Sequence, residues 1–491
     1  MRLSELVDGL PVSGSFGADP EVRGVEHDSR AVRPGDLFVA LPGVRFDGRA
    51  FAAAAVKAGA VAVVGPEPGD AAAGLDVPWL VAPEPRFALG PLAARVYGHP
   101  DREMLLAGVT GTNGKSTVAT LMTAVFEAAG VPAGFLGTLG YRFRDQTYAG
   151  GHTTPEASEF FRILRRMKDD GAGAVAMEVS SHALAMGRVD GAAFDAAVFT
   201  NLTRDHLDYH KDFEDYFAAK RKLFDRLKPG RRPAVNLDDE YGRRLARELP
   251  DALTFGEGGD VSVRDVVLST AGLSGVLATP RGELPFRSPL LGRYNLSNLL
   301  AAAAAAETLE LSHAAVAEAF AAQRPIPGRM EPVDHGQPFP VYIDYAHTDA
   351  ALDAALRSAR EVVGGGKVAV VFGCGGDRDP GKRPIMGKVA GELADLVIAT
   401  SDNPRSEDPL AILAAIEEGL KASGNRGYRL VPDRREAIHE AIAAAEPGWA
   451  VLIAGKGHER EQIIDDRKLP FSDLEEIGKA LEERFGSAVG R

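Results

Sequence analysis

The stretch GVTGTNGKST, residues 108–117, decides the fold of this chain. The apolar run before it, residues 104–109, predicts a buried parallel strand, and apolar residues at helical spacing after it predict a helix that stops at Gly130. A strand, a glycine-rich turn and a helix form an anion site, because backbone N–H groups and the helix dipole point at phosphate oxygens. Lys115 adds a positive charge and Ser116 can ligate Mg²⁺. The stretch therefore predicts a phosphate-binding loop.

The spacing of this loop departs from the strict P-loop pattern. Val109 stands where that pattern has its first glycine, and G-T-N-G-K-S over residues 111–116 stands instead. The alternative is a glycine-rich turn that carries a lysine by chance. The flanking strand and helix favour the phosphate loop, since the mechanism requires both.

Composition and charge limit the class of protein. A chain of 491 residues is too long for one core, so two to four domains are expected. The formal charge of −13 argues against a nucleic-acid or anionic-membrane protein. One cysteine, Cys374, fits a reducing cytoplasm, and we expect neither a signal peptide nor membrane insertion.

Alternating strand and helix patterns predict an α/β fold with three domains. Residues 1–98 form a small N-terminal α/β domain in this interpretation. Residues 99–326 form a central P-loop domain with a doubly wound parallel sheet, and residues 327–491 form a Rossmann-like α/β domain. Within the central part, residues 290–322 predict a long alanine-rich helix with Asn295 and Asn298 at its start, one of them as the N-cap.

Two further strands of the central part end in polar residues. The run 174–179 ends at Glu178, and His206 follows the run 196–199. Ligands of open α/β sheets sit at the carboxyl ends of strands, so both side chains should converge on the phosphate loop. A carboxylate such as Glu178 at that place is the usual Mg²⁺ partner. The alternative for Glu178 is a solvated acid at a strand end, and the alternative for His206 is a structural role.

The next predicted helix contains a misfit. Its apolar face, over residues 213–227, includes Lys220. A lysine on such a face must extend its ammonium to solvent, pair with an acid or lose its charge. The pattern alone leaves solvent extension and a functional lysine in the cleft equally open.

Four strands of the C-terminal part are followed by polar or glycine-rich loops, and these loops should meet at one sheet edge. The loops carry Arg378, Asp402, Arg405 and Glu459. Paired guanidinium groups beside acids suit a small zwitterion with carboxylate and ammonium groups. The alternative is a structural set of salt bridges.

Taken together, the ordered motifs resemble the Mur ligases, the ATP-dependent amide-bond ligases of peptidoglycan synthesis. The resemblance covers nearly the whole chain and includes GTNGKST, EVSSH, TNLTRDHLDYH, LLGRYNLSN, DYAHT, GCGGDRDPGKRP, DNPR and GKGHE. The last three are similar to the branch that adds meso-diaminopimelate to UDP-N-acetylmuramoyl-L-alanyl-D-glutamate. The resemblance implies ATP and Mg²⁺ as requirements, and it assigns the UDP-substrate, ATP and the amino acid to the three domains in chain order. We expect a monomer.

The resemblance also implies the site residues. The catalytic group is Lys115, Glu178, His206 and Lys220, and the metal ligands are Ser116, Glu178, His206 and Lys220, the last as a carbamate (N6-carboxylysine). ATP contacts are Gly111, Thr112, Asn113, Gly114, Lys115, Ser116, Thr117, Asn295, Arg329, Asp344 and His347. UDP-substrate contacts are His27, Ser29, Thr153, Thr154, Ser180 and Arg188. Amino-acid contacts are Arg378, Asp402, Asn403, Pro404, Arg405, Gly455 and Glu459.

The chain departs from the family pattern at three places, which are Asp349-Ala350 after DYAHT, residues 44–46 near the expected uridine pocket, and Met186. Three other functions remain as alternatives. A folylpolyglutamate-synthase-like ligase would act on a pterin substrate, a regulatory P-loop ATPase would need no acceptor, and a binding protein would leave the charged strand ends unexplained.

Overall fold

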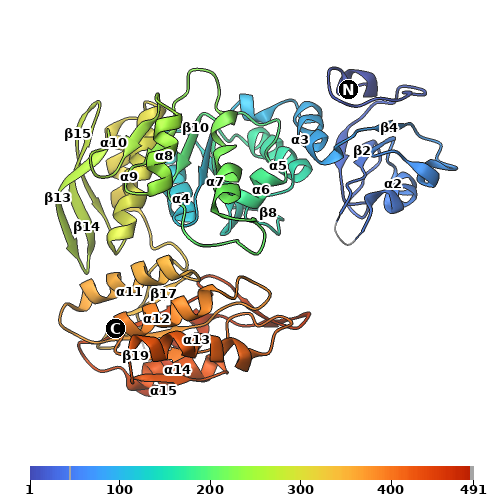
Figure 1. Ribbon diagram of the computed structural model, residues 1–491. Coiled ribbons are helices and arrows are strands. Elements are labelled where there is room, and N and C mark those ends of the chain that lie inside the picture. The colour runs from blue at the N-terminus through green and yellow to red at the C-terminus, as the bar shows by residue number, and fades with distance from the viewer. Residues whose placement is uncertain (44–45, 487–491) are drawn as a thin grey trace.

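The computed structural model describes residues 1–43 and 46–486, and it folds around three main sheets that follow one another along the chain (Figure 1). The departure noted at residues 44 and 45 lies outside the described residues. No helix in the described ranges is long and apolar enough to cross a bilayer. The α/β architecture with three domains agrees with the prediction.

The N-terminal sheet is small and parallel, with strand order β1-β2-β3-β4. Leu37, Val39 and Val64 are fully buried, and this face packs against the first and third helices. The elements are α1 (Leu3–Val7), β1 (Gly24–Glu26), β2 (Asp36–Val39), α2 (Ala52–Ala58), β3 (Ala62–Gly65), β4 (Trp79–Val81) and α3 (Pro85–Val96).

The central sheet has the order β12-β11-β10-β5-β9-β6-β7-β8. Its first six strands are parallel, as predicted, and β7 and β8 extend one edge as antiparallel strands. The strand before the phosphate loop, β5, lies between β10 and β9, so three polar strand ends are neighbours. These elements are β5 (Leu105–Thr110), α4 (Lys115–Ala128), β6 (Ala133–Gly137), β7 (Gly140–Phe143), β8 (Gln146–Tyr148), α5 (Ala157–Asp169), β9 (Ala174–Glu178), α6 (Ser181–Ala185), β10 (Ala196–Phe199), α7 (Phe213–Arg221), β11 (Ala234–Asn236), α8 (Glu240–Glu248) and β12 (Leu253–Phe255).

The alanine-rich region differs from the prediction. It forms two helices, α9 (Arg293–Thr308) and α10 (His313–Ala322), with Ser312 capping the second. Gly292 is the N-cap of α9, so the prediction of an asparagine cap is wrong. A separate antiparallel sheet of β13 (Ser262–Ser269), β14 (Gly272–Thr279) and β15 (Gly282–Ser288) precedes the helices and packs against them.

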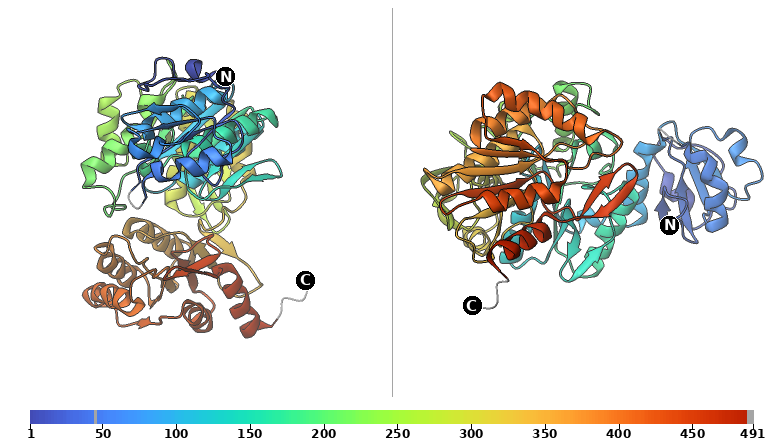
Figure 2. Two further views of the ribbon diagram at one scale, coloured as in Figure 1. Left: turned by 90° about the vertical axis from the view of Figure 1, so that its right-hand side faces the viewer. Right: turned by 90° about the horizontal axis from the view of Figure 1, so that it is seen from below.

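The C-terminal sheet has the order β16-β17-β21-β18-β19-β20, and only β16 is antiparallel to its neighbour. The C-terminal domain lies beside the central domain (Figure 2), and the loop after β17 faces that domain. The departure at Asp349-Ala350 leaves the helix start intact, because Thr348 caps it by accepting from Ala351 N. The elements are β16 (Glu331–Val333), β17 (Val341–Asp344), α11 (Asp349–Val363), β18 (Val368–Phe372), α12 (Lys382–Leu393), β19 (Leu396–Ala399), α13 (Pro409–Ser423), β20 (Tyr428–Leu430), α14 (Arg434–Ala444), β21 (Ala450–Ala454), β22 (Glu461–Ile464), β23 (Arg467–Pro470) and α15 (Asp473–Phe485).

Candidate active site

A cavity of about 350 Å³ lies between the central and C-terminal domains. The central domain lines it with the phosphate loop and with the loops after β9 and β10. The C-terminal domain contributes Arg329, Asp344 and His347 from the start of its chain. Residues far apart in the sequence therefore share one space, as the topology rule for parallel sheets requires.

The phosphate loop has the backbone that its glycines permit. Gly111 has φ +152, and a Cβ there would lie 1.8 Å from Thr200 Oγ1, so a side chain is excluded. The helix α4 begins at Lys115, directly after the loop. Lys115 Nζ donates to the carbonyls of Gly111 (3.0 Å) and Thr112 (2.8 Å), and burial lowers the pKa of its ammonium while Glu178 opposes that shift.

Glu178 and Ser116 supply oxygen atoms beside this loop. Glu178 ends β9 opposite Val109 of β5 and is 1% exposed. Its carboxylate accepts from Thr138 N (2.8 Å) and Thr138 Oγ1 (3.2 Å). Ser116 Oγ accepts from Arg329 Nη2 at 2.8 Å. A carboxylate and a hydroxyl suit a hard cation such as Mg²⁺, which keeps several waters and needs few protein ligands.

Lys220 lies in the cavity and not at the surface, so its extension to solvent is excluded. It is 1% exposed, and its Nζ donates to Gly111 O at 2.7 Å. Lys115 donates to the same carbonyl, so two amino groups share one acceptor. Burial and the nearby Lys115 hold the pKa of Lys220 well below its ordinary value. The structure therefore places a buried lysine side chain directly beside the phosphate loop.

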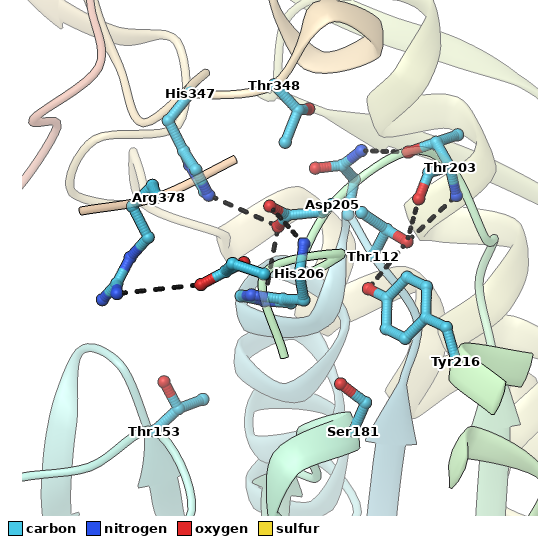
Figure 3. Close-up of polar contacts among 12 residues, drawn as sticks. Thr112, Thr153, Ser181, Thr203, Asp205, His206, Tyr216, His347, Thr348 and Arg378 are labelled. Atoms are coloured by element: carbon cyan, nitrogen blue, oxygen red, sulfur yellow. Dashed lines mark hydrogen bonds and ion pairs between the residues drawn. The ribbon is translucent and has the colours of Figure 1, made fainter. Parts of the chain in front are cut away.

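The cavity also contains an aspartate that we did not predict as a site residue. Asp205 Oδ2 lies 3.3 Å from His206 Nε2 and 3.7 Å from His347 Nε2, so it joins histidines of two domains (Figure 3). Burial lowers the pKa of His206 to about 3, and Asp205 opposes the shift. The signal in the sequence was its place beside His206, but neighbouring residues in a loop do not reveal which side chain faces the cavity. Among the described residues, no group of three or more His, Cys, Asp or Glu side chains has metal-binding geometry.

The predicted nucleotide contacts of the C-terminal domain lie around Asp344 at the end of β17. Its carboxylate accepts from Met330 N (2.7 Å) and Ala346 N (2.9 Å). The Arg329 guanidinium lies 4.9 Å from the centre of the Tyr345 ring. These contacts hold Arg329, Asp344 and His347 at the cavity wall.

The structure places Asn295 behind this wall. Asn295 is fully buried and donates to Leu291 O, and it accepts from Asn298 Nδ2 at 2.8 Å. Asn298 lines the cavity, one helical turn further along α9. The geometry thus places Asn298, which we did not assign, in front of Asn295.

Most of the predicted UDP-substrate residues converge beside Glu178. Thr154 Oγ1 donates to Glu178 O and accepts from Ser180 N, and Arg188 Nη1 donates to Thr154 O at 3.1 Å. Arg188 Nη2 also contacts the Sδ atom of Met186, one of the three places where the chain departs from the family pattern. Thr153 lines the cavity next to them.

The two N-terminal members of that set lie apart from the cavity lining. His27 Nδ1 contacts Ser158 Oγ of α5 at 3.0 Å, so it lies at the junction of the N-terminal and central domains. Ser29 lies in the turn that follows. The structure therefore brings only part of the UDP-substrate set together at the phosphate loop.

The predicted amino-acid residues gather at the carboxyl edge of the C-terminal sheet. Asn403 Nδ2 donates to Glu459 Oε2 at 3.0 Å, and Arg405 Nη1 donates to Gly376 O at 2.6 Å. A Cβ on Gly455, which has φ +111, would lie 2.7 Å from Asp402 Oδ2. Pro404 is buried between the predicted contact residues.

The two arginines of this set flank Gly375, since a Cβ there would lie 3.0 Å from Arg405 Nη1 and 3.7 Å from Arg378 Cγ. Arg378 Nη1 is 3.9 Å from Asp208 Oδ2 of the central domain (Figure 3). Burial lowers the pKa of Arg405, and Arg378 adds to that effect. Two close guanidinium groups attract a carboxylate.

An ion pair between the central and C-terminal domains lies near the carboxyl edge of the C-terminal sheet. Arg204 Nε lies 2.9 Å from Asp379 Oδ2, and both residues are on loops that border the cavity. Together with the contact of Arg329 with Ser116, this pair joins the C-terminal domain to the loops at the strand ends of the central domain. A phosphate loop closed by a second α/β domain is the arrangement of an ATP-dependent amide-bond ligase.

Comparison with known proteins gives the family. Three family models match, described as "Mur ligase family, catalytic domain" (residues 21–97), "Mur ligase middle domain" (109–306) and "Mur ligase, glutamate ligase domain" (328–457). The chain belongs to the Mur ligase family.

The relatives extend over the whole chain. A Geobacter metallireducens protein named UDP-N-acetylmuramoyl-L-alanyl-D-glutamate--2,6-diaminopimelate ligase is 45% identical over 100% of both chains. The protein of that name from Streptomyces coelicolor is 44% identical over 99% of this chain and 97% of its own. A solved structure of a ligase with the same name is 34% identical, with a TM-score of 0.69 and 99% coverage of both chains.

Proposed function

We propose that this protein joins meso-diaminopimelate to UDP-N-acetylmuramoyl-L-alanyl-D-glutamate with hydrolysis of ATP, in peptidoglycan biosynthesis. The products are the UDP-N-acetylmuramoyl tripeptide, ADP and phosphate. The observation that carries the proposal is the contact of the two domains beside the phosphate loop, where Arg329 donates to Ser116 and Arg378 lies 3.9 Å from Asp208. The names of the relatives support the same reaction.

The reaction proceeds in two steps. The side-chain carboxylate of D-glutamate attacks the γ-phosphorus of ATP, the bond to the bridging oxygen breaks, and ADP leaves. The free amine of diaminopimelate then attacks the acyl carbon of the acyl-phosphate, loses a proton, and phosphate leaves from a tetrahedral intermediate. Lys115 and the loop N–H groups stabilise the charge on the transferring phosphoryl group.

Ser116 and Glu178 would hold Mg²⁺, since both present oxygen atoms beside the loop. A bound Mg²⁺ would neutralise part of the triphosphate charge. His206 and Lys220 would serve a second ion. An ammonium only donates hydrogen bonds, so Lys220 would act there as a carbamate, formed when its neutral amine adds CO₂ and releases a proton.

The remaining assignments belong to the same proposal. His27, Ser29, Thr153, Thr154, Ser180 and Arg188 bind the UDP-substrate, and Gly111–Thr117 with Arg329, Asp344 and His347 bind ATP. Asn295 does not contact ATP in this proposal and supports Asn298 from behind the cavity wall. The domains are residues 1–98, 99–326 and 327–491, and the enzyme is a cytoplasmic monomer. Sedimentation of the purified chain measures the last point.

The first experiment measures phosphate release from ATP with the UDP-dipeptide and either meso-diaminopimelate or L-lysine. Release that needs the dipeptide and favours diaminopimelate supports the proposal. Release that favours lysine keeps the ligase and rejects the acceptor assignment. Release that ignores every acceptor indicates an ATPase switch.

Arg405→Ala tests the acceptor pocket. The variant is expected to lower kcat/KM for diaminopimelate by about 10²–10⁴-fold, because a site built around a carboxylate loses its partner. Activity with lysine, which lacks the distal carboxylate, should change much less. Arg357→Ala is the matched control, because Arg357 is an exposed arginine of α11. Unchanged discrimination between the two acceptors in Arg405→Ala contradicts the assigned role.

A further inference from the structure

A fully buried lysine lies directly behind the proposed amino-acid pocket. Lys456 is 0% exposed and follows β21 in the loop that carries Glu459. Its Nζ donates to Asn403 Oδ1 at 3.0 Å and to Glu459 Oε2 at 2.9 Å. A buried ammonium is costly unless it is paired and hydrogen-bonded, and these two contacts provide both.

The contacts fix the orientation of the Asn403 amide. Lys456 Nζ and Ile463 N only donate, and both approach the same atom of Asn403, so that atom is the oxygen. The amide nitrogen then faces Glu459, whose carboxylate accepts at 3.0 Å. Each of Lys456, Asn403 and Glu459 is hydrogen-bonded to the other two, and these bonds are compatible with only one orientation of the Asn403 amide.

These hydrogen bonds use one oxygen of Glu459 and leave the other for a ligand. Glu459 Oε2 accepts from both Lys456 and Asn403, while Oε1 has only a long contact of 3.4 Å with Tyr345 Oη among the described residues. The side chain of Glu459 is 29% exposed, so Oε1 can be reached from the pocket. An ammonium group is the natural donor to a carboxylate oxygen in that position.

We infer that Lys456 is a positioning residue of the acceptor pocket, which orients Asn403 and Glu459. This inference rests on the proposed function and adds a residue that acts through Glu459. Lys456 itself is covered by its partners and does not contact the acceptor.

The test compares two buried lysines of the same domain. Lys456→Met should raise KM for diaminopimelate about 10- to 100-fold, the effect of losing hydrogen bonds to a charged group. The KM values for ATP and the UDP-dipeptide should stay unchanged. Lys382→Met is the control, because Lys382 is also buried but donates to His347 O on the nucleotide side. It should alter KM for ATP and leave KM for diaminopimelate unchanged.

A double-mutant cycle separates positioning from loss of stability. If Lys456 acts through Glu459, the acceptor KM of the Lys456→Met, Glu459→Gln double variant should equal that of Glu459→Gln alone within about twofold. Additive effects, or an unchanged acceptor KM in Lys456→Met, overturn the inference. If Lys456→Met fails to fold, the same cycle with Lys456→Gln decides, since glutamine keeps a donor without the charge. If diaminopimelate does not increase phosphate release by the wild-type enzyme, the proposed function is wrong, and this outcome is distinct from a failure of the inference about Lys456.

Discussion

Replacing Lys220 by alanine is expected to lower kcat about 10²–10³-fold, the range seen when one group that stabilises the transition state is removed. The amine of Lys220 is buried among Gly111, Tyr216 and Lys115, so no solvent molecule replaces it without rearrangement. The measurement is phosphate release with ATP, the UDP-dipeptide and diaminopimelate all at saturating concentration. Lys222→Ala is the matched control, because Lys222 follows at the exposed end of the same helix.

The carbamate makes a second, independent prediction for this variant. A short carboxylic acid such as acetate should restore part of the activity of Lys220→Ala, since it supplies the lost carboxylate. With ¹³C-labelled bicarbonate, the wild-type enzyme should show a carbamate resonance that is missing in the variant. A wild-type spectrum without this resonance contradicts the modification, and near-normal turnover of Lys220→Ala contradicts any catalytic role.

The fold could be predicted from sequence because buried parallel strands are short apolar runs with polar ends. The four C-terminal strands predicted before polar loops are β17, β18, β19 and β21, and the runs before Glu178 and His206 became β9 and β10. Once three strands are parallel and adjacent, the topology brings their ends together, so Glu178 and His206 meet at the phosphate loop. Lys220 reaches the same loop from the helix α7. Their chemical roles stay predictions.

The parts that the sequence did not reveal depend on tertiary contacts. The sheet β13–β15 is only half-buried, so its strands lack a continuous apolar run. The start of α9 depends on Gly292 at φ +85, and its position decides that Asn298 and not Asn295 faces the cavity. Lys456 reads as an ordinary loop lysine until the fold buries it behind Asn403. The contact of Lys456 with Asn403 joins residues that are distant in sequence, so no local pattern reveals it.

Lys115→Ala is expected to produce the other large loss, with kcat about 10²–10³-fold lower and a raised KM for ATP. Lys115 Nζ is held by the carbonyls of Gly111 and Thr112, so it is positioned within the loop. The transferring phosphoryl group carries charge over three oxygens, and Lys115 is the loop's own full positive charge. Its removal should therefore reduce the stabilisation of the transition state more than it reduces the affinity for ATP.

The control for this variant must separate phosphate binding from folding. Binding of the UDP-dipeptide, measured by calorimetry, should be unchanged, because Thr153, Thr154 and Arg188 lie outside the contacts of Lys115. Lys115→Arg keeps the charge but replaces a compact ammonium by a planar fork, so it should recover ATP affinity more than turnover. If Lys115→Ala kept both its ATP affinity and its turnover, the loop at residues 111–117 would not hold the triphosphate. The nucleotide would then have to bind elsewhere, and the assignments of Ser116 and Glu178 would fail with that of Lys115, since all three rest on the same loop.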